Sequence, residues 1–293
     1  MLERAPPGWR NGRGFPAAMV AALADAVVER MRAQRRRGPL FVGLSGLPGS
    51  GKSTLAGQLG DALARRGHPS LILALDDFYL GKRARSRLAR EVHPLFATRG
   101  PAGTHDIARL HAVLDALRAR RTDIAFPRFD RLRDRPLPPS RWRTIRGGRP
   151  DVVLLEGWLV GVPPLSPRAL LRAPNALELH EDAGAVWRRA VNDALGSDYA
   201  RTWRRLDLLV ALLAPDLATM RRWRGEAERA MERTRGVQGM TRAGLRRFLE
   251  HYERWAAHAL RVLPELSDQV WRLDRRHEPL RCVPAGSRAG RPR

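Results

Sequence analysis

The chain has 293 residues, of which 43% are hydrophobic and 29% charged, enough for one large or two small globular domains with a sizeable core. No run of eighteen apolar residues, no apolar leader and a single cysteine, Cys282, argue against a membrane span, a secretory signal, an intrachain disulfide and a cysteine-rich zinc site, so we expect a cytoplasmic protein. The net charge of +24 comes almost wholly from dispersed arginines without a nucleic-acid-binding motif, which predicts no specific nucleic-acid partner.

The first predicted element is an amphipathic helix over residues 15–36. Its apolar side chains recur near one face, as at Met19, Leu23 and Val27. Before it, residues 1–15 carry proline and glycine turn formers without periodicity, and we expect them to form a flexible arm. After it, the apolar residues 39–45 predict a short strand.

A phosphate-binding loop follows this strand. The pattern G-x-x-x-x-G-K-[ST] is matched at every fixed position, and the apolar spacing after it predicts the helix that the motif requires. The glycines let successive backbone N–H groups point at phosphate oxygens, and the helix N-terminus adds partial positive charge. We expect Lys52 to reach the β- and γ-phosphates and Ser53 to ligate Mg²⁺. The chain is therefore predicted to bind a nucleoside triphosphate through Gly46, Leu47, Pro48, Gly49, Ser50, Gly51, Lys52, Ser53 and Thr54.

Two carboxylates, Asp76 and Asp77, follow the next predicted strand, residues 71–75. Its continuous apolar run is typical of a parallel strand buried on both faces, and open α/β sheets bind ligands at the carboxyl ends of such strands. Asp76 is placed to accept the proton of a substrate hydroxyl that attacks the γ-phosphate, or to help hold the metal. The structural alternative is a cap or an Asx-turn, and the preceding phosphate loop favours the functional interpretation.

Residues 83–90 form a basic helix candidate that leads into an irregular segment, residues 91–106. This segment is too rich in Gly, Pro, His and Thr for a regular element. Thr104 or Asp106 is suited to cap a helix over residues 107–120, whereas Arg99 and His105 have no such structural role and are candidates to contact an anionic or polyhydroxylated substrate.

Residues 125–136 are a second irregular segment, dense in Asp and Arg. They are interpreted equally well as self-paired surface charge and as a substrate-facing loop. The strand pattern of residues 151–155 then ends in Glu156. A carboxylate at that place is expected to hold the Mg²⁺ shell of a phosphate-loop site.

The last third of the chain is predicted to be mainly helical. Apolar spacing favours helices over residues 183–193, 201–213, 218–235 and 242–263, with short strands at 176–179 and 269–273. The arginine-rich helix over residues 218–235 is interpreted either as a lid over the triphosphate or as an ordinary solvated face. Residues 16–281 are expected to form a single domain, with the lid and helical region at about 183–263 and a disordered tail at 282–293.

Several motifs in this order resemble those of one kinase family. They are Asp-Asp-Phe-Tyr-Leu at 76–80, His-Pro-Leu-Phe-Ala-Thr-Arg-Gly at 93–100, Gly-Thr-His-Asp at 103–106 and Pro-Arg-Phe-Asp at 127–130. The chain is similar to the D-glycerate 3-kinases of plant and fungal type and their bacterial relatives, within the phosphoribulokinase, uridine kinase and pantothenate kinase superfamily. The resemblance covers about residues 38–275. It implies a three-layer α/β/α fold of the P-loop NTPase type, with a central, mostly parallel sheet and a helical C-terminal part.

The resemblance also implies roles for single residues. Asp76 matches the catalytic base, with Lys52 and Arg99 as catalytic partners, and Glu156, Ser53 and Asp76 match the metal-associated groups. The acceptor-binding residues that it implies are Asp77, Tyr79, Arg99, His105, Asp106, Asp130 and Arg131. One departure is Arg131, where relatives often carry lysine, because arginine keeps the charge but changes the donor geometry.

The combined expectation is a kinase that uses ATP and Mg²⁺ to phosphorylate a small acceptor, most simply D-glycerate at its 3-hydroxyl. A related kinase for a nucleoside, pantothenate or a sugar is the first alternative. A nucleic-acid-stimulated ATPase that uses the net charge, and a scaffold that binds nucleotide without catalysis, are the others.

Overall fold

A six-stranded sheet forms the centre of the molecule. The computed structural model describes residues 14–34, 38–145, 149–235 and 239–284. The strands lie in the order β10-β9-β8-β1-β7-β2, and all neighbours are parallel except β10, which is antiparallel to β9. Their bounds are β1 Leu40–Gly46, β2 Ser70–Ala74, β7 Val152–Gly157, β8 Leu208–Leu213, β9 Gln269–Leu273 and β10 Pro279–Pro284.

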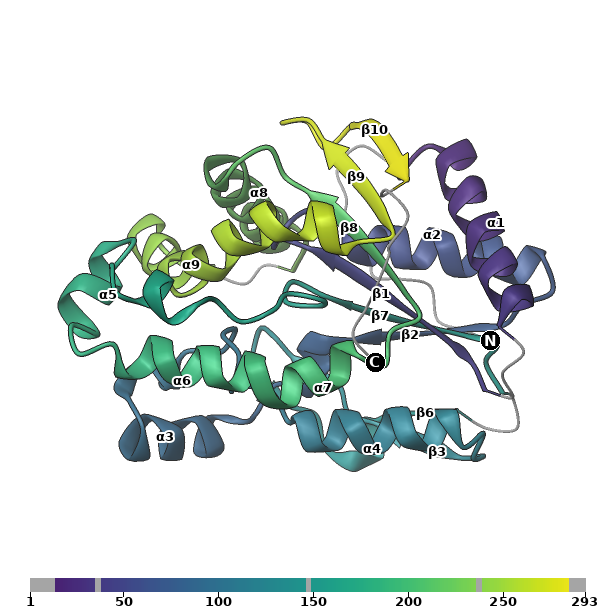
Figure 1. Cartoon of the computed structure of the whole chain (residues 1–293). Coiled ribbons are helices and arrows are strands. Elements are labelled where there is room, and N and C mark those ends of the chain that lie inside the picture. The colour runs from purple at the N-terminus through teal and green to yellow at the C-terminus, as the bar shows by residue number, and fades with distance from the viewer. Residues whose placement is uncertain (1–13, 35–37, 146–148, 236–238, 285–293) are drawn as a thin grey trace.

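Helices cover both faces of this sheet. Helix α2 contacts β1, β2 and β7 and packs beside α1 on one face, while α4, α6 and α7 lie along the opposite side (Figure 1). This is the predicted three-layer α/β/α arrangement around a mostly parallel sheet. The helices are α1 Ala17–Ala33, α2 Lys52–Arg65, α3 Lys82–Glu91, α4 Ile107–Arg118, α5 Ala176–Glu181, α6 Val186–Ala194, α7 Ala200–Trp203, α8 Leu217–Arg235 and α9 Arg242–Leu266.

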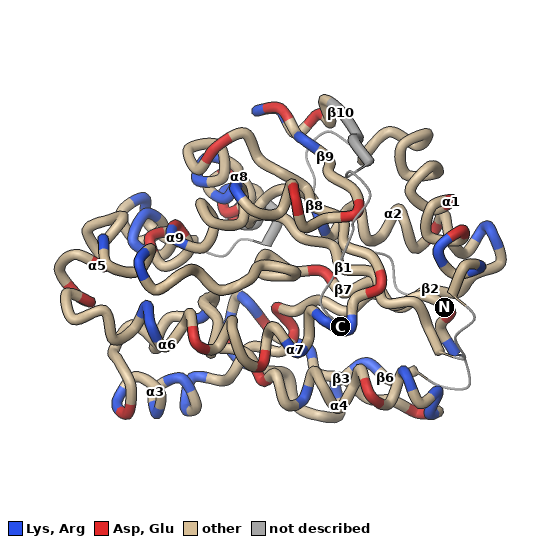
Figure 2. Tube along the Cα trace, viewed as in Figure 1, with Lys and Arg blue, Asp and Glu red and all other residues tan. Residues whose placement is uncertain are grey.

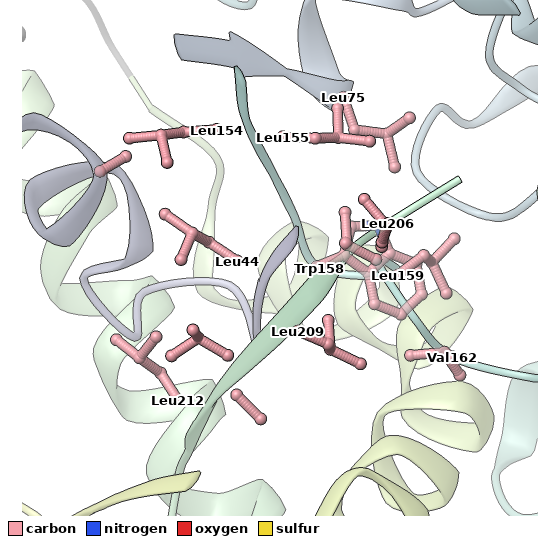
Figure 3. Close-up of a cluster of buried hydrophobic side chains, with 14 of the residues drawn as sticks. Leu44, Leu75, Leu154, Leu155, Trp158, Leu159, Val162, Leu206, Leu209 and Leu212 are labelled. Atoms are coloured by element: carbon pink, nitrogen blue, oxygen red, sulfur yellow. The ribbon is translucent and has the colours of Figure 1, made fainter. Parts of the chain in front are cut away.

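The core lies on both sides of the three central strands. Every residue of β1, β7 and β8 is buried, as expected for parallel strands that are covered on both faces. Figure 3 shows how Leu44 of β1, Leu154 and Leu155 of β7, and Leu209 and Leu212 of β8 gather with neighbouring apolar side chains. Burial of these side chains removes apolar area from water and stabilises the centre of the fold.

The register of the sheet gathers the predicted site residues at one edge. Ser45 of β1 pairs with Gly157 of β7, and Ala74 of β2 pairs with Glu156. The phosphate loop, Asp76 and Glu156 therefore leave their parallel strands at the same end of the sheet. Residues from Ile124 to Ile145 form two small hairpins, β3 Ile124–Phe126 with β6 Arg143–Ile145 and β4 Phe129–Asp130 with β5 Arg135–Pro136.

A buried ionic cluster joins the helices of the C-terminal part. The carboxylate of Glu178 in α5 accepts hydrogen bonds from Nε of Arg254 in α9 at 2.8 and 3.0 Å, and Arg188 in α6 contacts Asp182 at 2.9 Å. All four residues are buried. Several arginines thus serve the interior, and Figure 2 shows the remaining basic residues distributed along the helices and loops of the described chain.

Two predicted elements were wrong. Residues 176–179 form the start of helix α5, because the side chain of Asn175 accepts the N–H of Glu178 and caps a helix there. Residues 201–213 form the end of α7, a turn and strand β8, since the apolar run Leu208–Leu213 fills the sheet between β1 and β9. A continuous apolar run fits either element when it is buried all round.

The predicted termini need adjustment where the structure describes them. Phe15, expected in the arm, is buried against Trp271, and its backbone N–H donates to Oε1 of Gln58 at 2.8 Å. Strand β10 continues to Pro284, so the predicted tail begins later than residue 282. Residues 1–13 of the arm, 236–238 directly after the arginine-rich helix and 285–293 of the tail lie outside the described residues.

Candidate active site

The phosphate loop joins β1 to α2 and has the backbone that its glycines permit. Gly49 and Gly51 both have φ of 88°, a conformation that other residues adopt at a steric cost. Gly46, the first residue of the motif, has no room for a side chain, because a Cβ there would meet Oγ of Ser50 at 2.5 Å. The loop therefore stays tight in front of the α2 N-terminus, where Lys52 is the first helical residue.

The start of α8 packs directly on this loop. A Cβ at Gly49 would lie 2.9 Å from Cβ of Trp223, so the helix approaches the loop backbone closely. The Trp223 ring stacks on His277 with centroids 3.8 Å apart, and Nε2 of His277 donates to the carbonyl oxygen of Gly49 at 2.9 Å. Burial lowers the pKa of His277 to about 4, which keeps the ring neutral in this contact.

Ser53, at the start of α2, meets Glu156 near the end of β7. The Ser53 hydroxyl donates to Oε1 of Glu156 at 2.6 Å, and Glu156 is buried. A hydroxyl and a carboxylate are the hard oxygen donors that Mg²⁺ takes beside substrate phosphates, so the pair fits such an ion. Among the described residues no group of three or more His, Cys, Asp or Glu side chains is arranged to hold a metal by itself. These residues therefore fit an ion that is shared with a bound phosphate.

Asp76 is a partly buried carboxylate with a cationic surrounding. Its Oδ2 lies 3.4 Å from Nη1 of Arg131, while its Oδ1 is buried without a hydrogen-bond partner among the described residues. Burial alone would raise the pKa of Asp76, but the charges of Arg131 and Lys52 outweigh it and hold that pKa below its usual 3.8. Asp76 is thus ionised at neutral pH and able to accept a proton.

Asp77 has a different environment and a different contact. Its Oδ1 accepts the backbone N–H of Phe129 at 3.1 Å, which ties the β4 loop to the end of β2. Burial raises the pKa of Asp77, in contrast to that of Asp76. The two adjacent carboxylates therefore differ: Asp76 has one oxygen without a partner among the described residues, whereas Asp77 holds the loop of β4.

Tyr79 and His105 lie face to face. Their rings stack with centroids 4.3 Å apart, and a short antiparallel bridge joins the two backbones. Nδ1 of His105 lies 2.6 Å from the Tyr199 hydroxyl, whereas its Nε2 is buried without a partner among the described residues. Burial lowers the pKa of His105 to about 4, so the imidazole is neutral at physiological pH.

Arg99 is held by the loop that also carries Arg131. Nη1 of Arg99 donates to Oδ1 of Asp134 at 2.6 Å, and Nη2 donates to the Arg131 carbonyl oxygen at 3.0 Å. The other carboxylate oxygen of Asp134 binds the buried Arg85 at 2.5 Å. Residues 99 and 131–134 are therefore one connected unit, and Asp134 already neutralises part of the Arg99 charge.

Two predicted acceptor-binding residues have local structural contacts. Oδ1 of Asp106 accepts the backbone N–H of Arg109 at 2.9 Å and caps α4. Oδ1 of Asp130 accepts the N–H groups of Leu132 and Arg133, both at 3.1 Å, and shapes the turn between β4 and β5. The contact of Asp106 is the helix cap that the sequence suggested, and the roles of Asp106 and Asp130 toward a substrate stay predictions.

The arginines of the predicted lid are partly engaged with the protein. Arg221 pairs with Glu253 of α9 at 2.5 Å, and Arg224 pairs with Glu228 within α8 at 2.5 Å. The packing of Trp223 on Gly49 places the start of α8 beside the phosphate loop. Closure of this helix over a nucleotide stays a prediction.

Several known proteins are similar to this chain. Residues 17–79, from α1 through the phosphate loop to Tyr79, match the family model of the methylmalonyl Co-A mutase-associated GTPase MeaB. Over 223 residues the chain is 34% identical to a Schizosaccharomyces pombe protein described as the uncharacterized kinase mug58. The matched region covers 73% of this chain and 78% of the Schizosaccharomyces pombe protein. This chain belongs to the same family of P-loop kinases.

Two D-glycerate 3-kinases are also similar to this chain. Over 224 residues the chain is 29% identical to the chloroplastic D-glycerate 3-kinase of Arabidopsis thaliana, covering 73% of this chain but only 46% of that enzyme. The solved structure of the D-glycerate 3-kinase from Cryptococcus neoformans var. grubii matches with a TM-score of 0.73 at 25% identity, over 91% of this chain and 99% of the other. The predicted family resemblance is confirmed.

No helix in the described part of the chain is long and apolar enough to cross a membrane.

Three features of this P-loop kinase site had no signal in the sequence. Tyr199 contacts His105 from 94 residues away, and Asp134 bridges Arg85 and Arg99. Trp223 reaches the phosphate loop from a helix that reads only as basic and amphipathic. Each contact depends on tertiary packing that motif spacing does not encode.

Proposed function

We propose that this P-loop kinase transfers the γ-phosphate of ATP to a hydroxyl of a small anionic acceptor, most simply the 3-hydroxyl of D-glycerate. The observation that carries the proposal is Asp76, an ionised carboxylate with one unpartnered buried oxygen at the sheet edge that also bears the phosphate loop. The similarity to two D-glycerate 3-kinases supports glycerate as the acceptor.

In the proposed reaction the acceptor hydroxyl attacks the γ-phosphorus. A new bond forms between the hydroxyl oxygen and phosphorus, the bond between phosphorus and the β,γ-bridging oxygen breaks, and ADP leaves. The hydroxyl proton passes to the carboxylate of Asp76, which needs no change of charge state before the step. Lys52 and the loop N–H groups stabilise the charge of the β- and γ-phosphates.

The residues around the phosphate loop fit Mg²⁺ together with the nucleotide. Ser53 and Glu156 would hold the ion, which when bound neutralises phosphate charge and orients the β- and γ-oxygens. The protein's own part in this is to keep both oxygens side by side at 2.6 Å, one on α2 and one on β7.

Positive charge on the acceptor side supports an anionic acceptor. Arg131 is 56% exposed, and its nearest carboxylate is Asp76 at 3.4 Å, a weaker contact than that of Arg99 with Asp134 at 2.6 Å. The guanidinium of Arg131 thus keeps donors for a carboxylate, which arginine binds in a forked geometry. Arg99 serves the same acceptor by holding the loop of Arg131 through its carbonyl oxygen.

The test is ADP formation by the full chain with MgATP and one acceptor at a time. The acceptors are D-glycerate, L-glycerate, uridine, pantothenate and water alone. Turnover with D-glycerate far above the others supports the proposal, and turnover with another hydroxyl compound instead would replace the acceptor. The Asp76→Asn variant should lose transfer by at least ~10²-fold while it binds ATP normally. Asp61→Asn, an exposed carboxylate of α2, is the matched control.

A further inference from the structure

The Tyr199 hydroxyl is buried between two polar groups. Tyr199 closes a single π-helical turn, Leu195–Tyr199, between α6 and α7. Its hydroxyl oxygen lies 3.1 Å from the backbone nitrogen of Gly103 and 2.6 Å from Nδ1 of His105. Tyr199 is 1% exposed and His105 is 5% exposed, so the described residues leave little room for water to replace either contact. π-Turns of this kind are frequent at functional sites.

Counting protons at this hydroxyl fixes the tautomer of His105. The N–H of Gly103 can only donate, so it uses a lone pair of the Tyr199 oxygen. If Nδ1 of His105 also donated, the phenolic proton would be buried without an acceptor among the described residues, at a cost of about 1–3 kcal/mol. Tyr199 therefore donates to Nδ1, and the single proton of the neutral imidazole sits on Nε2.

The proton on Nε2 has no acceptor among the described residues. Nε2 of His105 and Oδ1 of Asp76 are both buried and both without a hydrogen-bond partner there. They belong to one site, since the Tyr79 ring stacks on His105 and Tyr79 follows Asp76 by three positions in the same short segment. One atom is a donor and the other an acceptor, and a hydroxyl group is able to satisfy both at once.

We propose that Tyr199 is a positioning residue that holds His105 as the Nε2–H tautomer, so that an acceptor hydroxyl can accept from His105 while it donates to Asp76. The identity of the hydroxyl rests on the proposed function, whereas the tautomer does not. His105 is then a fixed donor that orients the nucleophile, and Asp76 alone takes the proton. With the opposite tautomer, Nε2 would present a lone pair and compete with Asp76 for that proton.

A purely structural role for Tyr199 makes a different prediction. Its bond to Gly103 anchors the loop that runs from Gly100 to His105, and loss of that anchor would disturb the loop whatever side chain stands at position 105. The tautomer role instead requires an imidazole at position 105. His105→Gln distinguishes the two, because the glutamine amide presents N–H donors near the place of Nε2 and has no tautomer to fix.

The first experiment measures the tautomer directly. In the full chain labelled with ¹⁵N-histidine, two-bond ¹H–¹⁵N correlations at pH 7 identify the protonated ring nitrogen, and the His105 signals are those missing from His105→Gln. We expect Nε2–H in the unmodified protein and a mixture or the other tautomer in Tyr199→Phe. An Nδ1–H tautomer in the unmodified protein would overturn the proposal. No substrate is needed, so this result stands apart from that of the acceptor panel.

The second experiment compares the loss caused by Tyr199→Phe in two backgrounds. With His105 present, kcat/KM for the acceptor identified by the panel should fall about tenfold, while KM for ATP stays unchanged. In the His105→Gln background, the same substitution should change kcat/KM by less than about twofold, since no tautomer is left to hold. An equal loss in both backgrounds would mean that Tyr199 only anchors the loop. If His105→Gln is itself inactive, the tautomer measurement alone decides.

Discussion

Ser53 and Glu156 are 103 residues apart in the chain and meet through a hydrogen bond of 2.6 Å. The contact exists because β1 and β7 are neighbours in the sheet, with Ser45 opposite Gly157. A hydroxyl and a buried carboxylate are oxygen donors of the kind that Mg²⁺ takes beside substrate phosphates.

Glu156→Gln should raise the Mg²⁺ concentration needed for half-maximal turnover by at least about tenfold, because a neutral amide is a weaker magnesium ligand than a carboxylate. ATP affinity measured without Mg²⁺ should stay unchanged. Asp151→Asn is the matched control, since Asp151 directly precedes the same strand, at its opposite end, and pairs with His68 at 3.2 Å. A similar Mg²⁺ requirement in both variants would contradict the assignment of Glu156.

Arg131→Leu should move the acid limb of the kcat/KM profile to higher pH. Burial raises the pKa of Asp76, and the charge of Arg131 helps to hold that pKa below 3.8. Without this charge the pKa of Asp76 should rise, and the carboxylate should become protonated at a higher pH. Arg133→Leu, which removes a 68% exposed side chain from the same loop, should leave the limb in place. An unshifted limb in Arg131→Leu would show that Asp76 does not govern it.

The stability of the protein should fall as the pH is lowered from 7 to 5. Burial lowers the pKa values of His105 and His251 to about 4, below the ordinary 6.5, so the unfolded chain binds more protons than the folded one between these values. Each histidine should lower the free energy of unfolding by about 1–2 kcal/mol over this interval. The raised pKa of Asp77 acts with the opposite sign, but only as the pH approaches that of its own titration.

Denaturant unfolding at pH 7, 6 and 5 measures this dependence. His251→Asn should reduce the pH slope, because the asparagine amide keeps a donor near the carbonyl oxygen of Arg247 and does not titrate. A slope that is the same in this variant and in the unmodified chain would mean that His251 is not buried in its neutral form.

Gly100→Ala should destabilise the protein more than Gly67→Ala. Both glycines have positive φ, 129° and 79°, so both variants carry a backbone cost of about 1 kcal/mol. At Gly100 the new methyl would also lie 2.0 Å from the Tyr252 hydroxyl oxygen, whereas nothing lies within 4 Å at Gly67. The added overpacking should cost a further ~1–3 kcal/mol in the free energy of unfolding. An equal loss of the free energy of unfolding in both variants would show that the Tyr252 side chain can move aside without a cost in stability.

Much of the fold could be predicted because its signals are local. The glycine spacing before Lys52 predicts the phosphate loop, and the apolar runs followed by Asp76 and by Glu156 predict two strands of the sheet. Each of these signals lies within a few adjacent residues. The prediction of a helix over β8 is wrong because an all-apolar run has no periodicity, and only its place between β1 and β9 decides the element. Helix α5 did have a local signal, Asn175 followed three positions later by Glu178, which is a capping pattern.

The site was less predictable than the fold. Asp76 and Glu156 follow from motif position, but the largest charge that opposes the effect of burial on the pKa of Asp76 is that of Arg131, a residue of a distant loop. Asp106 shows the opposite limit, because its carboxylate caps α4 even though it lies in a motif of chemically active residues. Side-chain contacts over long chain separations carry the information that spacing lacks.

Identification of the phosphorylated product is the decisive test of whether this chain phosphorylates D-glycerate. The full chain is incubated with MgATP and D-glycerate, and ³¹P spectra are followed alongside ADP release. We expect one phosphomonoester, 3-phospho-D-glycerate, formed in equal amount to ADP and absent with Asp76→Asn. ADP released at the same rate without any acceptor, with free phosphate as its only partner, would contradict it.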